Sequence, residues 1–166
     1  MPAEAPAQPS ALIIARFDKA LHDRSAFSCG FGPIDNFLKS SLSDQTRNGM
    51  VTAWIATAEG DPAVLGFYTL GALAVRADLG PTKWQHAGVP DIPVIYIRAV
   101  AVRKDMQGKG LGAGLVVDAM RRCLGIAEQM GAAAIVLDVL EDDHFERRYK
   151  FYADLGFQPL RDPDNP

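Results

Sequence analysis

The chain has 166 residues, 48% of them hydrophobic and 22% charged, and its formal net charge is −3. This size and composition correspond to one ordinary globular domain and exclude a disordered chain. No apolar stretch approaches the roughly 20 residues that a membrane span requires, so a membrane protein is excluded as well. The acidic balance counts against a large polyanionic partner, although a local basic patch can coexist with an acidic remainder.

Residues 1–10 are rich in Ala and Pro and are expected to form a flexible segment ahead of one domain over residues 11–166. They contain no basic n-region, and the apolar run after them is too short for a secretory signal peptide, which predicts a cytoplasmic protein. Cys29 and Cys123 lie far apart without a CxxC spacing, and the three histidines are scattered. We therefore expect neither a disulfide nor a metal site.

Hydrophobic patterns in the first half predict one strand, one helix and a hairpin. Pro33 suits the first position of a helix, where its missing N–H has no partner to lose, and Asn48-Gly49 is typical of a helix end. A turn at Glu59–Pro62 separates two β-rich runs and favours an antiparallel hairpin. The expected elements are a strand over 11–17, a helix from 33 to 48, strands over 50–58 and 63–75, and a long irregular connection over 76–92.

The second half alternates strands with helices. Residues 93–102 are almost continuous in β-branched and aromatic side chains, which predicts a central strand covered on both faces. A long amphipathic helix is expected from Gly110 to Gly131. A buried strand over 133–139, a helix over 143–154 and a short last strand over 157–160 follow. The whole order predicts a mixed α/β sheet with helices on both faces.

Three glycines at alternating positions stand between the strand and the long helix, in Gln107-Gly108-Lys109-Gly110-Leu111-Gly112. Glycine lets the backbone approach a ligand closely and adopt positive φ. The first turn of the helix adds unpaired N–H groups and the positive end of the helix dipole, which together favour a pyrophosphate. Neighbouring Arg103, Lys104 and Lys109 can neutralise a further phosphate.

This segment resembles the [Q/R]-x-x-G-x-[G/A] signature of the GNAT N-acetyltransferases, and Phe151-Tyr152-Ala153-Asp154-Leu155-Gly156-Phe157 resembles that family's F-Y-x-x-x-G-F segment. The resemblance implies the GNAT acyltransferase fold, acetyl-CoA as co-substrate and no metal. It also implies that Tyr152 is the general acid that protonates the departing thiolate, a role that a phenol can fill. The cofactor-binding residues that it implies are Val100, Val102, Arg103, Gln107, Gly108, Lys109, Gly110, Leu111 and Gly112.

The group that deprotonates the acceptor amine is open. Asp138, Glu141, Asp142 and His144 come at or after the end of the strand over 133–139, where an acceptor could approach. The run Glu141-Asp142-Asp143 is also typical of a solvated acidic loop, and an amine can lose its proton to water. The sequence therefore assigns no general base.

The first half carries a narrower resemblance, to the GNAT toxins of toxin–antitoxin pairs. Phe27-Ser28-Cys29-Gly30, followed by Ile34-Asp35-Asn36-Phe37-Leu38 and Gln45, is similar to their F-D-C-G…L-N-x-[F/W]-L…Q opening, with Ser28 in place of Asp. The segments Gly66–Leu70 and Ile92–Val102 match two further motifs in part. The resemblance implies acetylation of aminoacyl-tRNA, a ribbon-helix-helix antitoxin as partner, and a homodimer. The substrate contacts that we expect are Arg98, Arg147 and Arg148.

Two other functions remain open from the sequence alone. A metabolic GNAT would acetylate a small amine or a protein amine, and an acidic surface suits cationic acceptors such as polyamines. A non-catalytic acyl-CoA-binding sensor is the other alternative, because function belongs to the site rather than to the fold.

Overall fold

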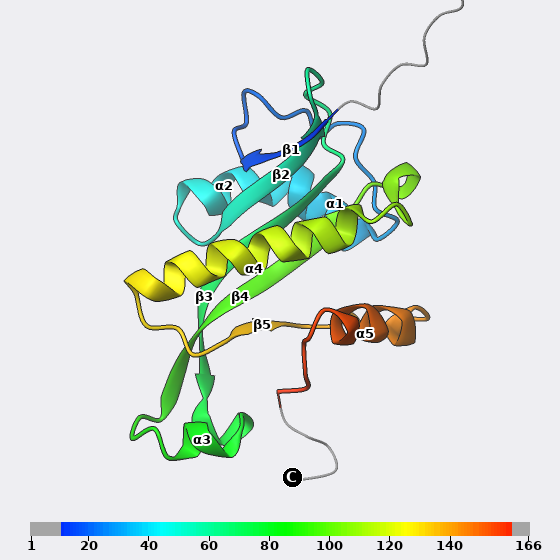
Figure 1. Ribbon diagram of the computed structural model, residues 1–166. Coiled ribbons are helices and arrows are strands. Elements are labelled where there is room, and N and C mark those ends of the chain that lie inside the picture. Colours follow the sequence, from blue (N-terminus) through cyan, green and yellow to red (C-terminus); the bar gives the residue numbers. More distant parts are fainter. Residues whose placement is uncertain (1–10, 161–166) are drawn as a thin grey trace, which may run out of the picture.

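The computed structural model describes residues 11–160 and shows one five-stranded sheet (Figure 1). The segment 1–10, which the sequence predicts to be flexible, lies outside the described residues. The first four strands pair antiparallel in chain order, and the fifth pairs parallel to the fourth. The strands are β1 (Leu12–Arg16), β2 (Thr52–Ala58), β3 (Gly66–Arg76), β4 (Asp91–Val102) and β5 (Ile135–Leu137).

Helices cover both faces of the sheet, which confirms the predicted mixed α/β architecture. The segment α1 (Gly32–Asn36), a π-helical turn (Phe37–Ser41) and α2 (Leu42–Arg47) packs on one face through Leu38 and Leu42. The long helix α4 (Leu111–Gln129) packs on the other face through Leu115 and Cys123. Phe67 belongs to the first core and its neighbour Tyr68 to the second, as the alternation of side chains along a strand requires.

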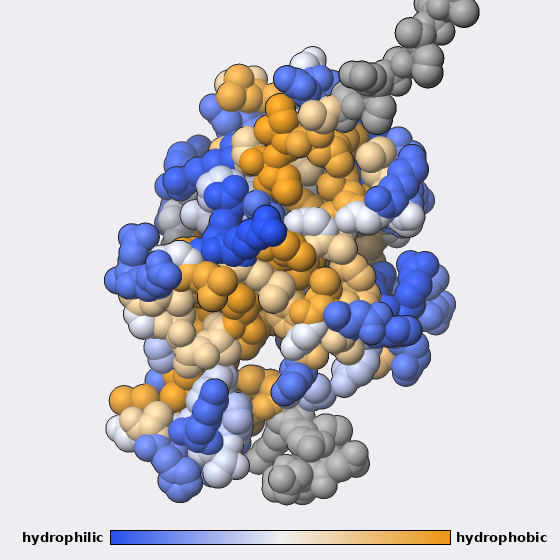
Figure 2. All heavy atoms as spheres, viewed as in Figure 1, coloured by the Kyte–Doolittle hydropathy of each residue, from blue (hydrophilic) through white to orange (hydrophobic). Residues whose placement is uncertain are grey.

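The remaining helix, α5 (Phe145–Asp154), follows β5 and lies beside the start of α4 (Figure 1). A Cβ atom placed on Gly112 would lie 3.8 Å from the ring of Phe151, an ordinary van der Waals distance, so the two helices are close neighbours here. Figure 2 shows the molecule from the α4 side, where hydrophilic side chains along α4 separate two hydrophobic areas of the surface.

A β-bulge interrupts the pairing of β3 with β4. Tyr68 pairs with Val100, and Leu70 pairs with Ile97, so one residue of β3 faces two residues of β4. The extra residue, Arg98 or Ala99, changes which side chains point to each face, and bulges of this kind redirect side chains next to functional sites. Strand β4 thus has covered residues on both faces but also exposed ones, Asp91, Pro93 and Arg98. It lies between β3 and β5, one strand in from the edge of the sheet.

The predicted long connection is present over residues 77–90, but it is not irregular throughout. Strands β3 and β4 remain paired as far as Arg76 and Asp91, and the connection between them contains a 3₁₀ turn (Ala77–Leu79) and α3 (Thr82–Gln85). Trp84 of α3 is only 4% exposed because its indole packs on Ile92 and Val94. The tip of the hairpin thus has a small apolar cluster of its own around Trp84.

The prediction of a last strand over 157–160 is also wrong, since these residues form no strand in the structure. Phe157 is partly buried and packs against the core on the α4 side, and its ring lies edge-on to that of Tyr152 at 5.8 Å. The strand expected over 133–139 is present only as the three residues of β5. The first helix, the β2–β3 hairpin and the long helix agree with the prediction within a few residues.

Within residues 11–160, no helix is long and apolar enough to cross a bilayer. The same part of the chain holds no group of three His, Cys, Asp or Glu side chains arranged to bind a metal ion. Cys29 and Cys123 are both free thiols.

Candidate active site

The loop before α4 has the backbone conformation that the glycine pattern predicts. Gly108 has φ 74° and Gly110 has φ 86°, both in the region that favours glycine. Gly110 is the N-cap of the 19-residue helix α4, and no described side chain caps this helix end. The N–H groups of the first turn therefore have neither an intrahelical nor a capping partner, and they are available to an anion.

The side chain of Gln107 holds the loop rather than pointing to a ligand. Its Nε2 donates to the carbonyl oxygens of Val102 and Cys29, both at 2.9 Å. The second bond ties the loop to the segment before α1, as does the bond from the Lys104 amide to the Ser28 carbonyl at 2.9 Å. The side chain of Gln107, predicted to belong to the cofactor-binding set, thus has a supporting role.

The segment Phe27-Ser28-Cys29-Gly30, to which the loop is hydrogen-bonded, is itself held to α1 by Asp35. The carboxylate of Asp35 accepts a hydrogen bond from the Ser28 hydroxyl at 2.9 Å and another from the Cys29 amide at 2.8 Å. These two bonds hold the pKa of Asp35 below its usual value, although burial opposes them. Ser28 therefore keeps a polar link to the first turn of α1 at the position where the resembling toxins have Asp.

The charges beside the loop differ in how far they are neutralised. Arg103 makes a bidentate ion pair with Asp105, with N–O distances of 2.7 and 2.9 Å, so its positive charge is partly compensated. Lys104 and Lys109 form no ion pair with any carboxylate of residues 11–160. These two ammonium groups are the better candidates for the phosphate charge that the sequence predicts.

Strands β4 and β5 separate immediately before the loop. Their pairing ends at Ile97 and Leu137, whereas the pairing of β4 with β3 continues to Val102. From Arg98 to Val102, no strand of the described chain pairs with the β5-side edge of β4. Main-chain groups at this edge around Val100 therefore have no strand partner and can bind an extended ligand, as the GNAT resemblance implies, whereas the Val102 carbonyl already accepts from Gln107 Nε2.

Tyr152 lies on α5 within a cluster of aromatic rings. The rings of Phe151 and Phe157 pack edge-on against it at 5.1 and 5.8 Å. Burial raises the pKa of the Tyr152 phenol, and the positive charge of Arg148 opposes this only in part. The phenol is therefore protonated at neutral pH, which a proton donor requires.

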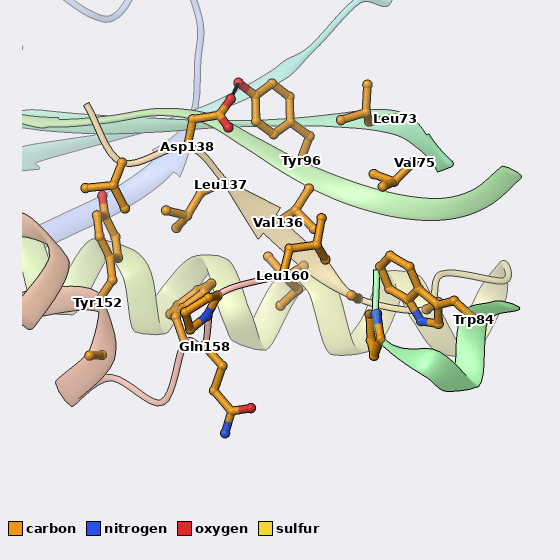
Figure 3. A pocket seen from close by; sticks show the side chains of 18 of the residues that line it. Leu73, Val75, Trp84, Tyr96, Val136, Leu137, Asp138, Tyr152, Gln158 and Leu160 are labelled. Carbon is orange, nitrogen blue, oxygen red and sulfur yellow. Dashed lines mark hydrogen bonds between the residues drawn. The ribbon is translucent and has the colours of Figure 1, made fainter. Parts of the chain in front are cut away.

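Tyr152 lines a cavity of about 420 Å³ at the outer edge of β5. Figure 3 shows its hydroxyl pointing toward the end of β5 and the residues that follow it, near Leu137. Tyr96 and Asp138 line the same cavity, and the Tyr96 hydroxyl donates to Asp138 Oδ2 at 2.8 Å. Sequence reasoning offered Asp138 as one of four candidate bases but missed Tyr96, whose only signal was its place on the predicted central strand.

The three predicted substrate contacts fall in two places. Arg98 projects from the bulge toward the α1 side, where it bonds Gln45 Oε1 at 3.0 Å and covers the ring of Phe37. Arg147 is exposed on α5. Arg148 is paired with Asp142 at the start of α5, and this pairing lowers the pKa of Asp142. Arg148 and Asp142 therefore neutralise each other, and neither is free for catalysis.

Comparison with known proteins decides the family. A model described as an acetyltransferase (GNAT) domain matches residues 50–159 of the chain. The chain belongs to the GNAT acetyltransferase family. This GNAT protein is 34% identical over 154 residues to a probable toxin TacT of Sinorhizobium fredii. The matched region covers 89% of this chain and 84% of the relative. The chain is 30% identical over 138 residues to a tRNA-acetylating toxin of Mycobacterium tuberculosis, with coverages of 82% and 80%.

Solved structures of GNAT toxins have the same fold. AtaT complexed with acetyl-methionyl-tRNA superposes with a TM-score of 0.80 at 27% identity, over 92% of this chain and 90% of AtaT. AtaTR bound with acetyl-CoA is similar with a TM-score of 0.74 at 28% identity, over 92% and 88% of the two chains. The predicted GNAT fold and the resemblance to GNAT toxins are thus confirmed.

Proposed function

We infer that this GNAT protein is a tRNA-acetylating toxin that transfers the acetyl group of acetyl-CoA to the amino group of an aminoacyl-tRNA. The observation that carries this inference is the similarity to TacT and to the tRNA-acetylating toxin at 34% and 30% identity along more than four fifths of this chain. The structure of AtaT with acetyl-methionyl-tRNA, at 27% identity, supports the same acceptor class.

The loop and the separated strands fit acetyl-CoA as the donor. Gly108 and Gly110 have positive φ angles, and together with the uncapped first turn of α4 they offer backbone amides that would bind the pyrophosphate. The unpaired edge of β4 beyond Ile97 holds the extended arm. When bound, acetyl-CoA supplies the thioester carbonyl that the amine attacks.

The chemistry that remains for the side chains is proton transfer. The acceptor amine gives a proton to solvent or to a nearby base and then forms a C–N bond to the carbonyl carbon. The C–S bond breaks, and the second amine proton leaves to solvent. Tyr152, kept protonated by burial, donates its proton to the thiolate sulfur and regains one from water.

Two partners follow from the toxin function. An antitoxin that covers the toxin is expected, since AtaT has been solved bound to the C-terminus of the antitoxin AtaR. Its ribbon-helix-helix class and a homodimeric toxin stay predictions from the sequence. A cytoplasmic location is expected as well, because aminoacyl-tRNA is found there.

The test is to incubate the purified protein with labelled acetyl-CoA and total aminoacyl-tRNA, and to measure label in N-acetyl-aminoacyl-tRNA. We expect transfer to one or a few aminoacyl-tRNAs, and loss of transfer with Tyr152→Phe. Transfer to polyamines or protein amines with none to tRNA would replace the toxin by a metabolic enzyme. Acetyl-CoA binding with no transfer to any amine would indicate a sensor.

A further inference from the structure

A carboxylate and its supporting phenol share the cavity of Tyr152. Asp138 directly follows β5, and Tyr96 is the residue of β4 that pairs with Val136. The Tyr96 hydroxyl donates to Asp138 Oδ2 at 2.8 Å, and both side chains line the cavity that Tyr152 lines (Figure 3). The proton donor that we propose and an acceptor-only group therefore line one cavity, which extends along β5.

The hydrogen bond from Tyr96 engages only one of the two carboxylate oxygens of Asp138. A carboxylate has two acceptor oxygens, and in the described chain only Oδ2 of Asp138 has a hydrogen-bond partner. The phenol also restricts the orientation of the carboxylate, because Tyr96 is half-buried on an inner strand. Burial, followed by the bond to Asp138, raises the pKa of Tyr96, so the phenol remains a donor at neutral pH.

The other acidic candidates of this region are engaged or lie outside the cavity. Asp142 is neutralised by Arg148 and accepts the His144 amide at 2.9 Å. Glu141 and Asp143 do not line the cavity. Asp138 is thus the carboxylate of this segment that lines the same cavity as Tyr152.

We propose that Asp138, oriented by Tyr96, binds the protonated α-amino group of the aminoacyl-tRNA and so determines that the enzyme accepts a free amine. An α-amino group has an ordinary pKa of about 7.7–8.0 and is mainly an ammonium at neutral pH. A charge-assisted hydrogen bond from this ammonium to Oδ1 places the nitrogen near the thioester. The acetylated product carries no such charge and is released. Asp138 contacts the substrate, and Tyr96 is a positioning residue.

This proposal rests on the proposed function, and a binding experiment separates the two. We would measure the Kd of wild type and Asp138→Asn for three tRNA forms: aminoacyl-tRNA, N-acetyl-aminoacyl-tRNA and deacylated tRNA. Asparagine keeps the size of aspartate and an oxygen that accepts from Tyr96. We expect wild type to bind the aminoacyl form about 10-fold more tightly than the N-acetyl form, and Asp138→Asn to bind both alike.

Asp143→Asn is the matched control, because it makes the same chemical change on the same exposed loop. It should keep the wild-type preference. Tyr96→Phe should lose part of the preference, raising KM for aminoacyl-tRNA more than it lowers kcat, with unchanged affinity for acetyl-CoA. If Tyr96 had a merely structural role, Tyr96→Phe would instead weaken the binding of all three tRNA forms and of acetyl-CoA together.

The outcomes distinguish the two proposals. If wild type acetylates aminoacyl-tRNA and Asp138→Asn keeps the preference for the free amine, the role of Asp138 is refuted while the function stands. If wild type acetylates no aminoacyl-tRNA and does not distinguish the three forms, both proposals are wrong.

Discussion

Substituting Gly110 by alanine tests the geometry on which acetyl-CoA binding depends. Gly110 has φ 86°, and a Cβ atom placed there would meet no heavy atom within 4 Å. Steric crowding by neighbours is therefore absent, and the effect comes from the backbone alone. An L-residue in this left-handed conformation costs about 1–2 kcal/mol relative to glycine.

The conformational cost of alanine at position 110 must appear either in the free energy of unfolding or in the Kd of acetyl-CoA. If the loop keeps its conformation, the free energy of unfolding falls by about 1–2 kcal/mol and acetyl-CoA binds as before. If the loop relaxes to negative φ, its amides turn away from the pyrophosphate, and Kd rises roughly 5- to 30-fold for the same free energy. Urea denaturation and isothermal titration together measure both.

Gly114→Ala is the control, because Gly114 lies inside α4 and a Cβ there also meets nothing within 4 Å. Alanine has a higher helix propensity than glycine, so this variant should be more stable by about 0.5–1 kcal/mol and bind acetyl-CoA normally. If Gly110→Ala were as stable as wild type and bound acetyl-CoA equally well, the left-handed cradle would be refuted.

Three further predictions concern the catalytic role of Tyr152, tRNA binding by Arg147, and the three tyrosines whose pKa values are raised. Tyr152→Phe should lower kcat by about 100-fold and leave the Kd of acetyl-CoA unchanged, and an unchanged kcat in steady-state assays would remove Tyr152 from the mechanism. Arg147→Gln should weaken tRNA binding and lower the slope of log Kd against log salt by about one. The control Lys19→Gln, at an exposed residue of the connection after β1, should leave the slope unchanged. Equal slopes for wild type and Arg147→Gln in filter binding would exclude a phosphate contact at Arg147. The pKa values of Tyr68, Tyr96 and Tyr152 are all raised above the unfolded value of about 10, so their stabilising effect is complete below pH 10 and is lost as pH rises toward the folded values. Urea denaturation should therefore show stability falling above pH 10, with a shallower fall for Tyr68→Phe; the same slope in both proteins would contradict this linkage.

Local chemistry made part of this structure predictable. Pro33 at a helix start, the turn at Glu59–Pro62 and the glycines of the loop each restrict their own backbone, so the helix, the hairpin and the loop follow from neighbouring residues. Tyr152 was recognisable because its motif is continuous in sequence. The structure adds that Tyr152 is partly buried and packs against the rings of Phe151 and Phe157, and this burial favours the protonated phenol that the proposed role requires.

Contacts between distant residues were not predictable in the same way. Gln107 binds a carbonyl 78 residues away, and Tyr96 binds a carboxylate 42 residues away. Neither pairing leaves a local pattern, since both depend on which strands the fold makes adjacent. The wrong strand over 157–160 has a related cause: a β-rich run specifies its alternation but not its partner, and the partly buried Phe157 packs against a core cluster instead.

The acidic net charge and a polyanionic acceptor are compatible because of how the charges are distributed. At physiological salt the Debye length is about 8 Å, so a phosphate senses only the charges near it. Around the site, Arg103, Arg148 and Lys150 each have a carboxylate within ion-pairing distance, whereas Lys104, Lys109 and Arg147 form no ion pair within residues 11–160. Arg147 on α5 is thus an uncompensated cation available to a phosphate backbone, while Lys104 and Lys109 lie beside the loop that we propose for the acetyl-CoA phosphates. Specificity then has to come from groups that contact the aminoacyl end, and this is the place of Asp138 and Tyr96.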